Sequence, residues 1–124
     1  MERPKEQIKS HRDLVVWQKA VQLVVDLYNL TKSFPKEETY GLTNQIRRAA
    51  ASIPANIAEG QGRRLGGEYQ QFLGHARGSL CELDTHIEVA FRIGYLAESQ
   101  YQQAREKMDE VGRMLNGLLR SLQS

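Results

Sequence analysis

The chain has 124 residues, of which 40% are hydrophobic and 26% are charged, and its formal net charge is +2. This size suits one domain with its own core, and the ordinary balance of apolar and charged residues excludes a largely disordered chain. The single cysteine cannot form an internal disulfide, and no apolar run near the start is long enough for a membrane span, so we expect a cytoplasmic protein.

The first expected elements are a flexible N-terminal tail over residues 1–11, which are polar and mixed in charge, and a single domain over 12–124. A first helix should run from an N-cap at Asp13 to about Lys32. Apolar residues at steps of three and four predict its core stripe: Leu14, Trp17, Val21, Val24 and Tyr28. A second apolar set favours a subunit contact over a helix sunk deeper in its own bundle: Val16, Ala20, Leu23, Leu27 and Leu30.

A second helix should begin in an acidic first turn at Glu37 and Glu38 and end near Gly60 or Gln61. Its core stripe is expected to contain Leu42, Ile46, Ala49, Ile53 and Ile57. Because these apolar steps continue through Pro54, we predict one helix that is kinked there. Several glycines near its end should supply left-handed conformations: Gly60, Gly62, Gly66 and Gly67.

A third helix is expected over residues 67–93, closed by Gly94, and a fourth over residues 98–122. Their core stripes are Tyr69, Leu73, Ala76, Leu80, Leu83, Ile87 and Ala90, and then Tyr101, Ala104, Met108, Val111, Leu115, Leu118 and Leu122. Cys81 is expected to be a small buried thiol of the third helix. Four stripes and short connections predict an all-α protein, a left-handed, antiparallel, up-down-up-down four-helix bundle.

Small residues recur at helical spacing outside these core stripes. The second helix carries Ala51, Ala55 and Ala58, and the third carries Gly74 and Gly78 followed by Cys81 and Thr85. Glycine costs about 1 kcal/mol in a helix interior, so two glycines four residues apart need a packing reason. These ridges predict the interface of a homo-oligomer, in which another helix approaches closely.

Charge is distributed unevenly along the chain. From residue 42 to 65, four arginines (Arg47, Arg48, Arg63 and Arg64) stand against one acid, whereas two arginines face four acids from residue 66 to 95. The basic and acidic helices can complement each other inside the bundle or across a subunit contact. The other interpretation is an anion-binding face, in which the four arginines contact phosphate groups in a bidentate manner. No aromatic residues interleave with them, so no sequence-specific readout is predicted.

A polar ridge also follows the second helix: Gln45, Arg48, Ser52, Asn56, Glu59 and Arg63. It either borders the core and bonds to neighbouring helices or subunits, or it forms a recognition strip.

Catalytic and cofactor patterns are weak. No glutamate has a histidine three residues later, as di-metal four-helix bundles require, and Glu82 with His86 and His75 is better explained as an exposed polar stripe. There is no hydrolase nucleophile motif, and no strand precedes Gly60-Gln61-Gly62. We therefore expect no enzymatic activity, cofactor, metal or small-molecule substrate.

Several motifs together resemble one bacterial family, the 23S rRNA intervening-sequence proteins. They are Leu14-Val15-Val16-Trp17-Gln18-Lys19-Ala20, Phe34-Pro35, Tyr40-Gly41-Leu42, Gln45-Ile46-Arg47-Arg48-Ala49-Ala50, Ser52-Ile53-Pro54-Ala55-Asn56-Ile57-Ala58-Glu59-Gly60, Gly78-Ser79-Leu80 with Glu82-Leu83, and Gly94-Tyr95-Leu96. The resemblance implies an up-down four-helix bundle that assembles into a ring-like homopentamer and has no enzymatic activity.

Two functions remain open at this point. The first is a non-catalytic, homo-oligomeric protein that binds RNA or DNA through Arg47, Arg48, Arg63 and Arg64, with avidity from the repeated copies. The second is a protein-interaction scaffold in which the ridges and arginines build the oligomer and dock another protein.

Overall fold

The computed structural model describes residues 8–123, which form four long helices and no strand. The helices are α1 (Val15–Thr31), α2 (Leu42–Gly62), α3 (Tyr69–Arg92) and α4 (Glu98–Ser121). Three short 3₁₀ helices lie between or before them: η2 (His11–Asp13), η3 (Lys36–Glu38) and η4 (Arg64–Gly66). The expected all-α, four-helix fold is therefore confirmed.

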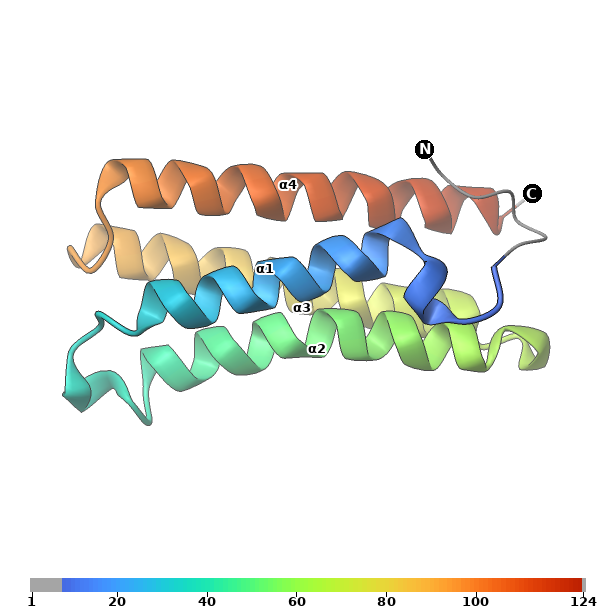
Figure 1. The fold of residues 1–124 in the computed structure, drawn as a ribbon, viewed down its shortest axis with the longest axis horizontal. Helices are drawn as coiled ribbons and strands as arrows, with labels where there is room; N and C mark the ends of the chain where they lie inside the picture. Colours follow the sequence, from blue (N-terminus) through green and yellow to red (C-terminus); the bar gives the residue numbers. More distant parts are fainter. Residues whose placement is uncertain (1–7, 124) are drawn as a thin grey trace.

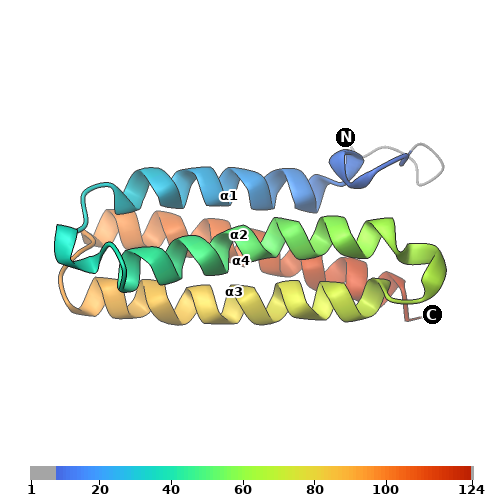
Figure 2. The same cartoon turned by 90° about the horizontal axis from the view of Figure 1, so that it is seen from below.

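The four helices lie side by side, and the chain reverses its direction at each connection (Figure 1). Each helix contacts the next one in the sequence and α4 returns to α1, whereas no close backbone contact joins α1 to α3 or α2 to α4 within residues 8–123. Figure 2 shows α1 and α3 on opposite sides, with α2 and α4 between them. The α2–α3 contact is the most extensive and the α1–α4 contact the least. The start of α1, the α2–α3 turn and the end of α4 share one end of the bundle.

The core stripes predicted for the last three helices are largely confirmed. Fully buried side chains along them include Ile46, Ile53, Ile57, Leu73, Leu83, Ile87, Val111 and Leu115. On α4, Leu119 is buried and the expected Leu118 only partly so. Apolar area removed from water by these residues, at roughly 25 cal/mol per Å², is the main force that holds the bundle together.

The core stripe predicted for α1 is wrong, because a different face of this helix packs into the core. The core receives Val16, Ala20, Leu23, Leu27 and Thr31, whereas Trp17, Val21 and Val24 are only partly buried and Tyr28 is 41% exposed. Leu14 is buried, but it precedes the helix in extended backbone with ψ of 125°. Since both faces of this helix are apolar, the three-and-four spacing cannot choose between them, and packing against α2 and α4 makes the choice.

α2 is one helix from Leu42 to Gly62 and continues through Pro54, which is buried. A kink at this residue and the left-handed twist of the bundle stay predictions. The helix begins later than expected, because Glu37 and Glu38 form the separate turn η3. Glu38 nevertheless caps α2 from outside, since its Oε1 accepts a hydrogen bond from the Leu42 amide at 3.1 Å. Its other oxygen accepts one from the Tyr95 hydroxyl at 2.8 Å, which ties α2 to the end of α3.

The glycines near the helix ends have different roles. Gly94 ends α3 as predicted, in the left-handed region with φ of +91°, while the Tyr95 amide donates to the Ala90 carbonyl at 2.9 Å in a Schellman arrangement. Of the four glycines expected to be left-handed after α2, only Gly67 is, with φ of +83°. Gly60 instead lets α2 approach α3, because a Cβ there would lie 3.0 Å from the Phe72 Cβ.

The first described residues contact the bundle. Ile8 packs against the core, and Ser10 Oγ accepts a hydrogen bond from the Arg12 amide at the start of η2. The rings of His11 and Trp17 meet edge to face, with 5.0 Å between their centroids. Residues 1–7 of the expected tail lie outside the described residues.

Candidate nucleic-acid interface

Arg47 is engaged with the neighbouring helix α1. Its Nε donates to the Thr31 hydroxyl at 2.9 Å, its Nη2 donates to the Tyr28 carbonyl at 3.2 Å, and its guanidinium lies 4.6 Å from the Tyr28 ring centroid. Thr31 is only 3% exposed, so this hydrogen bond reaches the edge of the core. Arg47 therefore joins α2 to α1, and two of its nitrogens already have acceptors.

Arg48 faces solvent. Successive side chains on an α-helix point about 100° apart, so Arg48 points away from the contact that Arg47 makes with α1. It is exposed and has no hydrogen-bond or ion-pair partner among residues 8–123. Its guanidinium keeps all five N–H donors available for phosphate oxygens.

Arg63 and Arg64 lie at the turn between α2 and α3. Arg63 pairs with Glu59 at 3.7 Å and Glu68 at 3.2 Å, and its guanidinium lies 5.3 Å from the Phe72 ring centroid. Arg64 Nη1 donates to the Gln61 carbonyl at 3.0 Å. Both side chains remain exposed, but two carboxylates balance the charge of Arg63.

The four arginines do not form one strip. Arg48 and Arg63 are fifteen residues apart, which is about 22 Å along a helix, and Arg47 points to α1. A ligand that contacts all four must span most of α2.

The centre of the polar ridge on α2 binds α3. Ser52 Oγ and Ser79 Oγ share a hydrogen bond of 2.7 Å, and Asn56 Nδ2 donates to the Ser52 carbonyl at 2.8 Å. This part of the ridge therefore bonds to a neighbouring helix at the edge of the core, which is the first of the two interpretations given to the ridge above. Its two arginines, Arg48 and Arg63, project from the ends into solvent.

Both small-residue ridges lie on outer faces. Ala51, Ala55 and Gly78 are exposed, and Ala58 and Gly74 are half-buried. A Cβ added to Gly74 or Gly78 would meet no atom within 4 Å, so contacts among residues 8–123 do not explain why glycine stands there.

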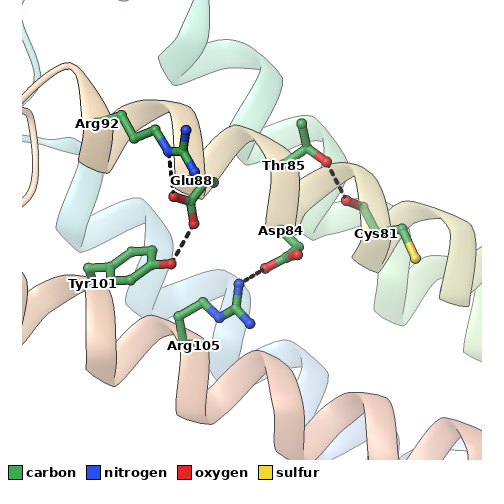
Figure 3. Close-up of polar contacts among 7 residues, drawn as sticks. All are labelled: Cys81, Asp84, Thr85, Glu88, Arg92, Tyr101 and Arg105. Atoms are coloured by element: carbon green, nitrogen blue, oxygen red, sulfur yellow. Dashed lines mark hydrogen bonds and ion pairs between the residues drawn. The ribbon is translucent and has the colours of Figure 1, made fainter.

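Cys81 is exposed, which corrects the expectation of a buried thiol. It continues the glycine ridge on the outer face of α3 rather than the core stripe, and its carbonyl accepts a hydrogen bond from the Thr85 hydroxyl at 3.1 Å (Figure 3).

Two acidic residues of α3, Asp84 and Glu88, are engaged with α4, and Glu82 pairs with His86 of its own helix. Figure 3 shows Asp84 paired with Arg105 of α4 at 2.6 Å, and Glu88 accepting hydrogen bonds from Tyr101 and Arg92. The hydrogen bond from Tyr101, and then that from Arg92, hold the pKa of Glu88 below its ordinary value. No ion pair joins α2 to α3 directly in the described chain, apart from Arg63 with Glu68 at their connection. The two helices thus do not neutralise each other within one protomer.

The residues considered for metal binding form a simple pair. His86 Nε2 lies 3.2 Å from Glu82 Oε2, and residues 8–123 contain no group of three histidine, cysteine or acidic side chains that could hold a metal ion. None of the described helices combines the length and the apolar character that crossing a membrane requires.

Sequence reasoning about the basic residues missed three arginines outside α2. Arg77 on α3 and Arg113 and Arg120 on α4 are exposed, and Arg113 and Arg120 have no partner in the part of the chain that the structure describes. The seven-residue spacing from Arg113 to Arg120, two helical turns, was a signal that could have found them.

Comparison with known proteins agrees with the fold. Residues 12–117 match the family described as 23S rRNA-intervening sequence protein. A protein of unknown function from the S23 ribosomal protein family of Bacteroides thetaiotaomicron has a similar crystal structure, with a TM-score of 0.79 and 25% sequence identity, covering 86% of this chain and 96% of the other. No match is found among curated proteins.

Proposed function

Because the chain belongs to the 23S rRNA-intervening sequence protein family, we propose that it is a non-catalytic, cytoplasmic homo-oligomer that binds RNA or another nucleic acid. The observation that carries nucleic-acid binding is Arg48, an exposed guanidinium with no partner in residues 8–123, beside a face suited to assembly. Phosphate contacts of this kind position a nucleic acid without reading its sequence.

The proposed subunit contact uses the small-residue ridges: Ala51, Ala55 and Ala58 on α2, and Gly74 and Gly78 on α3. Their exposure supports the close approach of a second copy. Val25 and Tyr28 leave an apolar face on α1, beside α2, at 47% and 41% exposure. Since both ridges lie on outer faces, a head-to-tail contact can pair α2 of one copy with α3 of the next. The family resemblance favours five copies.

Within this proposal the four arginines have unequal roles. Arg48 is the principal phosphate ligand, and Arg64 adds to it at the α2–α3 turn, where its side chain is exposed. Arg47 mainly holds α1, and the charge of Arg63 is balanced by Glu59 and Glu68. A ring would repeat each free arginine in every copy and convert weak contacts into avidity.

Fluorescence anisotropy of labelled structured RNA and duplex DNA, titrated with the protein over a series of salt concentrations, tests this function. We expect an affinity that falls linearly on a log–log plot, with a slope of about −0.9 per phosphate contacted on duplex DNA. The double variant Arg48→Gln and Arg64→Gln should reduce the slope of log affinity against log salt concentration. The charge-matched double variant Lys32→Gln and Lys36→Gln should leave that slope unchanged. Absence of binding to either nucleic acid at low salt would refute the proposal.

A protein scaffold is the second candidate function. It is favoured by the use of Arg47 within the fold and by two large apolar residues at the bundle ends, Tyr40 and Leu65, each 93% exposed. A stoichiometric protein partner that stays bound after nuclease treatment, together with absence of nucleic-acid binding, would support this alternative.

A further inference from the structure

α4 differs from α1 and α3 in its surface, because it carries no exposed large hydrophobic residue. Large hydrophobic side chains that are exposed within residues 8–123 lie on α1, on α3 and its C-cap, and in the connections on either side of α2: Val25, Tyr28, Val89, Ile93, Tyr40 and Leu65. None of them is on α4. The exposed apolar surfaces are therefore on α1, on α3 and at the connections, whereas α4, like α2, presents a polar face.

The second half of that polar face is basic. Arg113 and Arg120 are both exposed and two turns apart, and their side chains have no hydrogen-bond or ion-pair partner within residues 8–123. Asn116 lies between them on the helix, one turn from each. From α3, Arg77 Nη1 donates to Asn116 Oδ1 at 3.3 Å, which brings a third guanidinium to the same place. An open groove of about 330 Å³ runs alongside between α3 and α4, and Arg113 and Asn116 are among its lining residues.

The acids near these arginines leave them with excess positive charge. Asp84 is already paired with Arg105 at 2.6 Å, and Glu110 with Lys19 of α1 at 3.6 Å. Asp109 is the remaining acid within one turn of Arg113, and no ion pair joins the two. Three guanidiniums thus face one free carboxylate.

The helix dipole does not account for this arrangement. A cation in the last turn of a helix is stabilised by the negative end of the dipole, which explains Arg120, but this effect is confined to that turn. Arg113 lies two turns before the end of α4, and Arg77 lies in the first half of α3.

From these observations we infer that Arg77, Arg113 and Arg120, called here the α3–α4 arginine strip, form a second phosphate-backbone contact site for nucleic acid. The inference rests on the proposed nucleic-acid-binding function and assigns to it a surface separate from α2. The side chains beside the arginines on the outer face of α4 are small or polar, namely Gly112, Asn116, Gly117 and Ser121, whereas Met114 and Leu118 of the same segment pack against the core. A strongly basic, polar surface without an apolar anchor is typical of nucleic-acid interfaces, whereas protein interfaces have a buried apolar or aromatic centre.

Arg113 and Arg120 lie away from the proposed oligomer contacts, whereas Arg77 borders them. The small-residue ridges lie on the outer faces of α2 and α3, whereas Arg113 and Arg120 lie on α4. Arg77 is next to Gly78 of the α3 ridge, and Cys81, which continues that ridge, lines the groove between α3 and α4. A ring assembled through the ridges of α2 and α3 would leave Arg113 and Arg120 of every copy accessible to nucleic acid.

The test uses a double variant that carries both Arg113→Gln and Arg120→Gln, called here the strip variant. Its charge-matched control carries both Lys32→Gln and Lys36→Gln, which removes two cations from the other end of the bundle. Glutamine keeps helix propensity, so helical content should not change. In anisotropy titrations over a salt series, the strip variant should bind roughly 25- to 60-fold more weakly at about 0.1 M salt and lose about 1.4 to 1.8 of the log–log slope. The control should bind like the wild type.

A second measurement uses the unmodified protein. Phenylglyoxal modifies accessible arginines, and labelled structured RNA should protect Arg113 and Arg120 from it, as read by peptide mass spectrometry. This readout stays valid if the double variant folds poorly.

The outcomes separate this inference from the function on which it rests. Unchanged affinity of the strip variant, with loss of binding in Arg48→Gln, would overturn the inference and leave the proposed function standing. Equal losses in the strip variant and the lysine control would also overturn it, because only net charge would then matter. Absence of binding by the wild-type protein would overturn both.

Discussion

Adjacent arginines on α2 show that residue type alone does not determine whether a side chain makes contacts within the fold. Arg47 and Arg48 have the same chemistry and neighbouring positions, yet one donates to Thr31 and the other meets solvent. A turn of about 100° between successive helical residues separates a contact within the fold from a free charge.

This difference predicts unequal effects on stability. Arg47→Ala should lower the free energy of unfolding by about 1–2 kcal/mol, because it removes a charged hydrogen bond and a cation–π contact. Arg48→Ala should change it by less than about 0.5 kcal/mol. Urea denaturation followed by circular dichroism measures both, and equal effects would mean that the Arg47 contacts contribute nothing.

Glu88 gives a pH-dependent prediction at the same scale. The hydrogen bond from Tyr101 lowers the pKa of Glu88 in the folded protein, so the unfolded chain binds the proton more readily. The contribution to stability is therefore present above the ordinary glutamate pKa of about 4.3 and is lost as the pH falls through the folded pKa.

Tyr101→Phe removes that hydrogen bond while keeping the ring. NMR titration should then show the pKa of Glu88 moving upward, and the acid-induced loss of stability should become shallower. Tyr28→Phe is a suitable control, because the Tyr28 contacts with Arg47 use its ring and its carbonyl. A pKa of Glu88 that is identical in Tyr101→Phe and the wild type would contradict the assigned cause.

Among the elements, α4 is attached differently from the others. Each ion pair that joins two of the four helices in residues 8–123 includes α4: Lys19 with Glu110, Asp26 with Lys107, and Asp84 with Arg105. The α1–α4 contact is also the least extensive of the bundle. Burial is the largest single effect on Asp26 and raises its pKa, but the hydrogen bonds from Lys107 and Gln22 and the charge of Lys107 together leave the pKa below the ordinary value.

We therefore expect α4 to open more readily than α2. Surface ion pairs contribute about 0–1 kcal/mol each and are screened by salt, whereas apolar contacts are not. Native-state hydrogen exchange should show a lower opening free energy for the amides of α4 than for those of α2, with a difference that grows from about 0.05 to 0.5 M salt. Equal protection of the two helices at both salt concentrations would contradict this expectation.

At the scale of the whole molecule, the glycine ridge of α3 predicts opposite effects on stability and assembly. Gly74→Ala with Gly78→Ala should stabilise the isolated protomer by up to about 1 kcal/mol per site, because alanine favours a helix and each Cβ has room. The same Cβ atoms would separate this face from a second copy and weaken the oligomer. Light scattering after size exclusion and thermal unfolding measure the two effects.

Gly117→Ala on α4 is the matched control for this pair. It too is a helix glycine whose Cβ would meet nothing within 4 Å, but it lies outside the proposed subunit contact. It should raise stability without changing the oligomeric state. If the double variant Gly74→Ala and Gly78→Ala keeps the oligomeric state of the wild type, the glycine ridge is not part of the interface.

Much of the architecture was predictable because hydrophobic periodicity and turn residues are local signals. The spacing of Ile46, Ile53 and Ile57 predicted the buried face of α2, and Gly94 predicted the end of α3. Boundaries were less predictable: Glu38 caps α2 from a separate turn, through a side chain that also bonds Tyr95. The extent of the N-terminal tail, the single domain over 12–124 and the interface residues stay predictions.

The sequence by itself determined the class of fold, since four apolar stripes with a period near 3.5 can be buried together only as packed helices. Only the tertiary structure decided which face of α1 enters the core, because both of its faces are apolar and the choice depends on the neighbouring helices. It also decided that Cys81 is exposed and that Arg47 is used while Arg48 is free. These are properties of contacts between residues distant in the chain, such as Arg47 with Thr31, and local spacing carries no information about them.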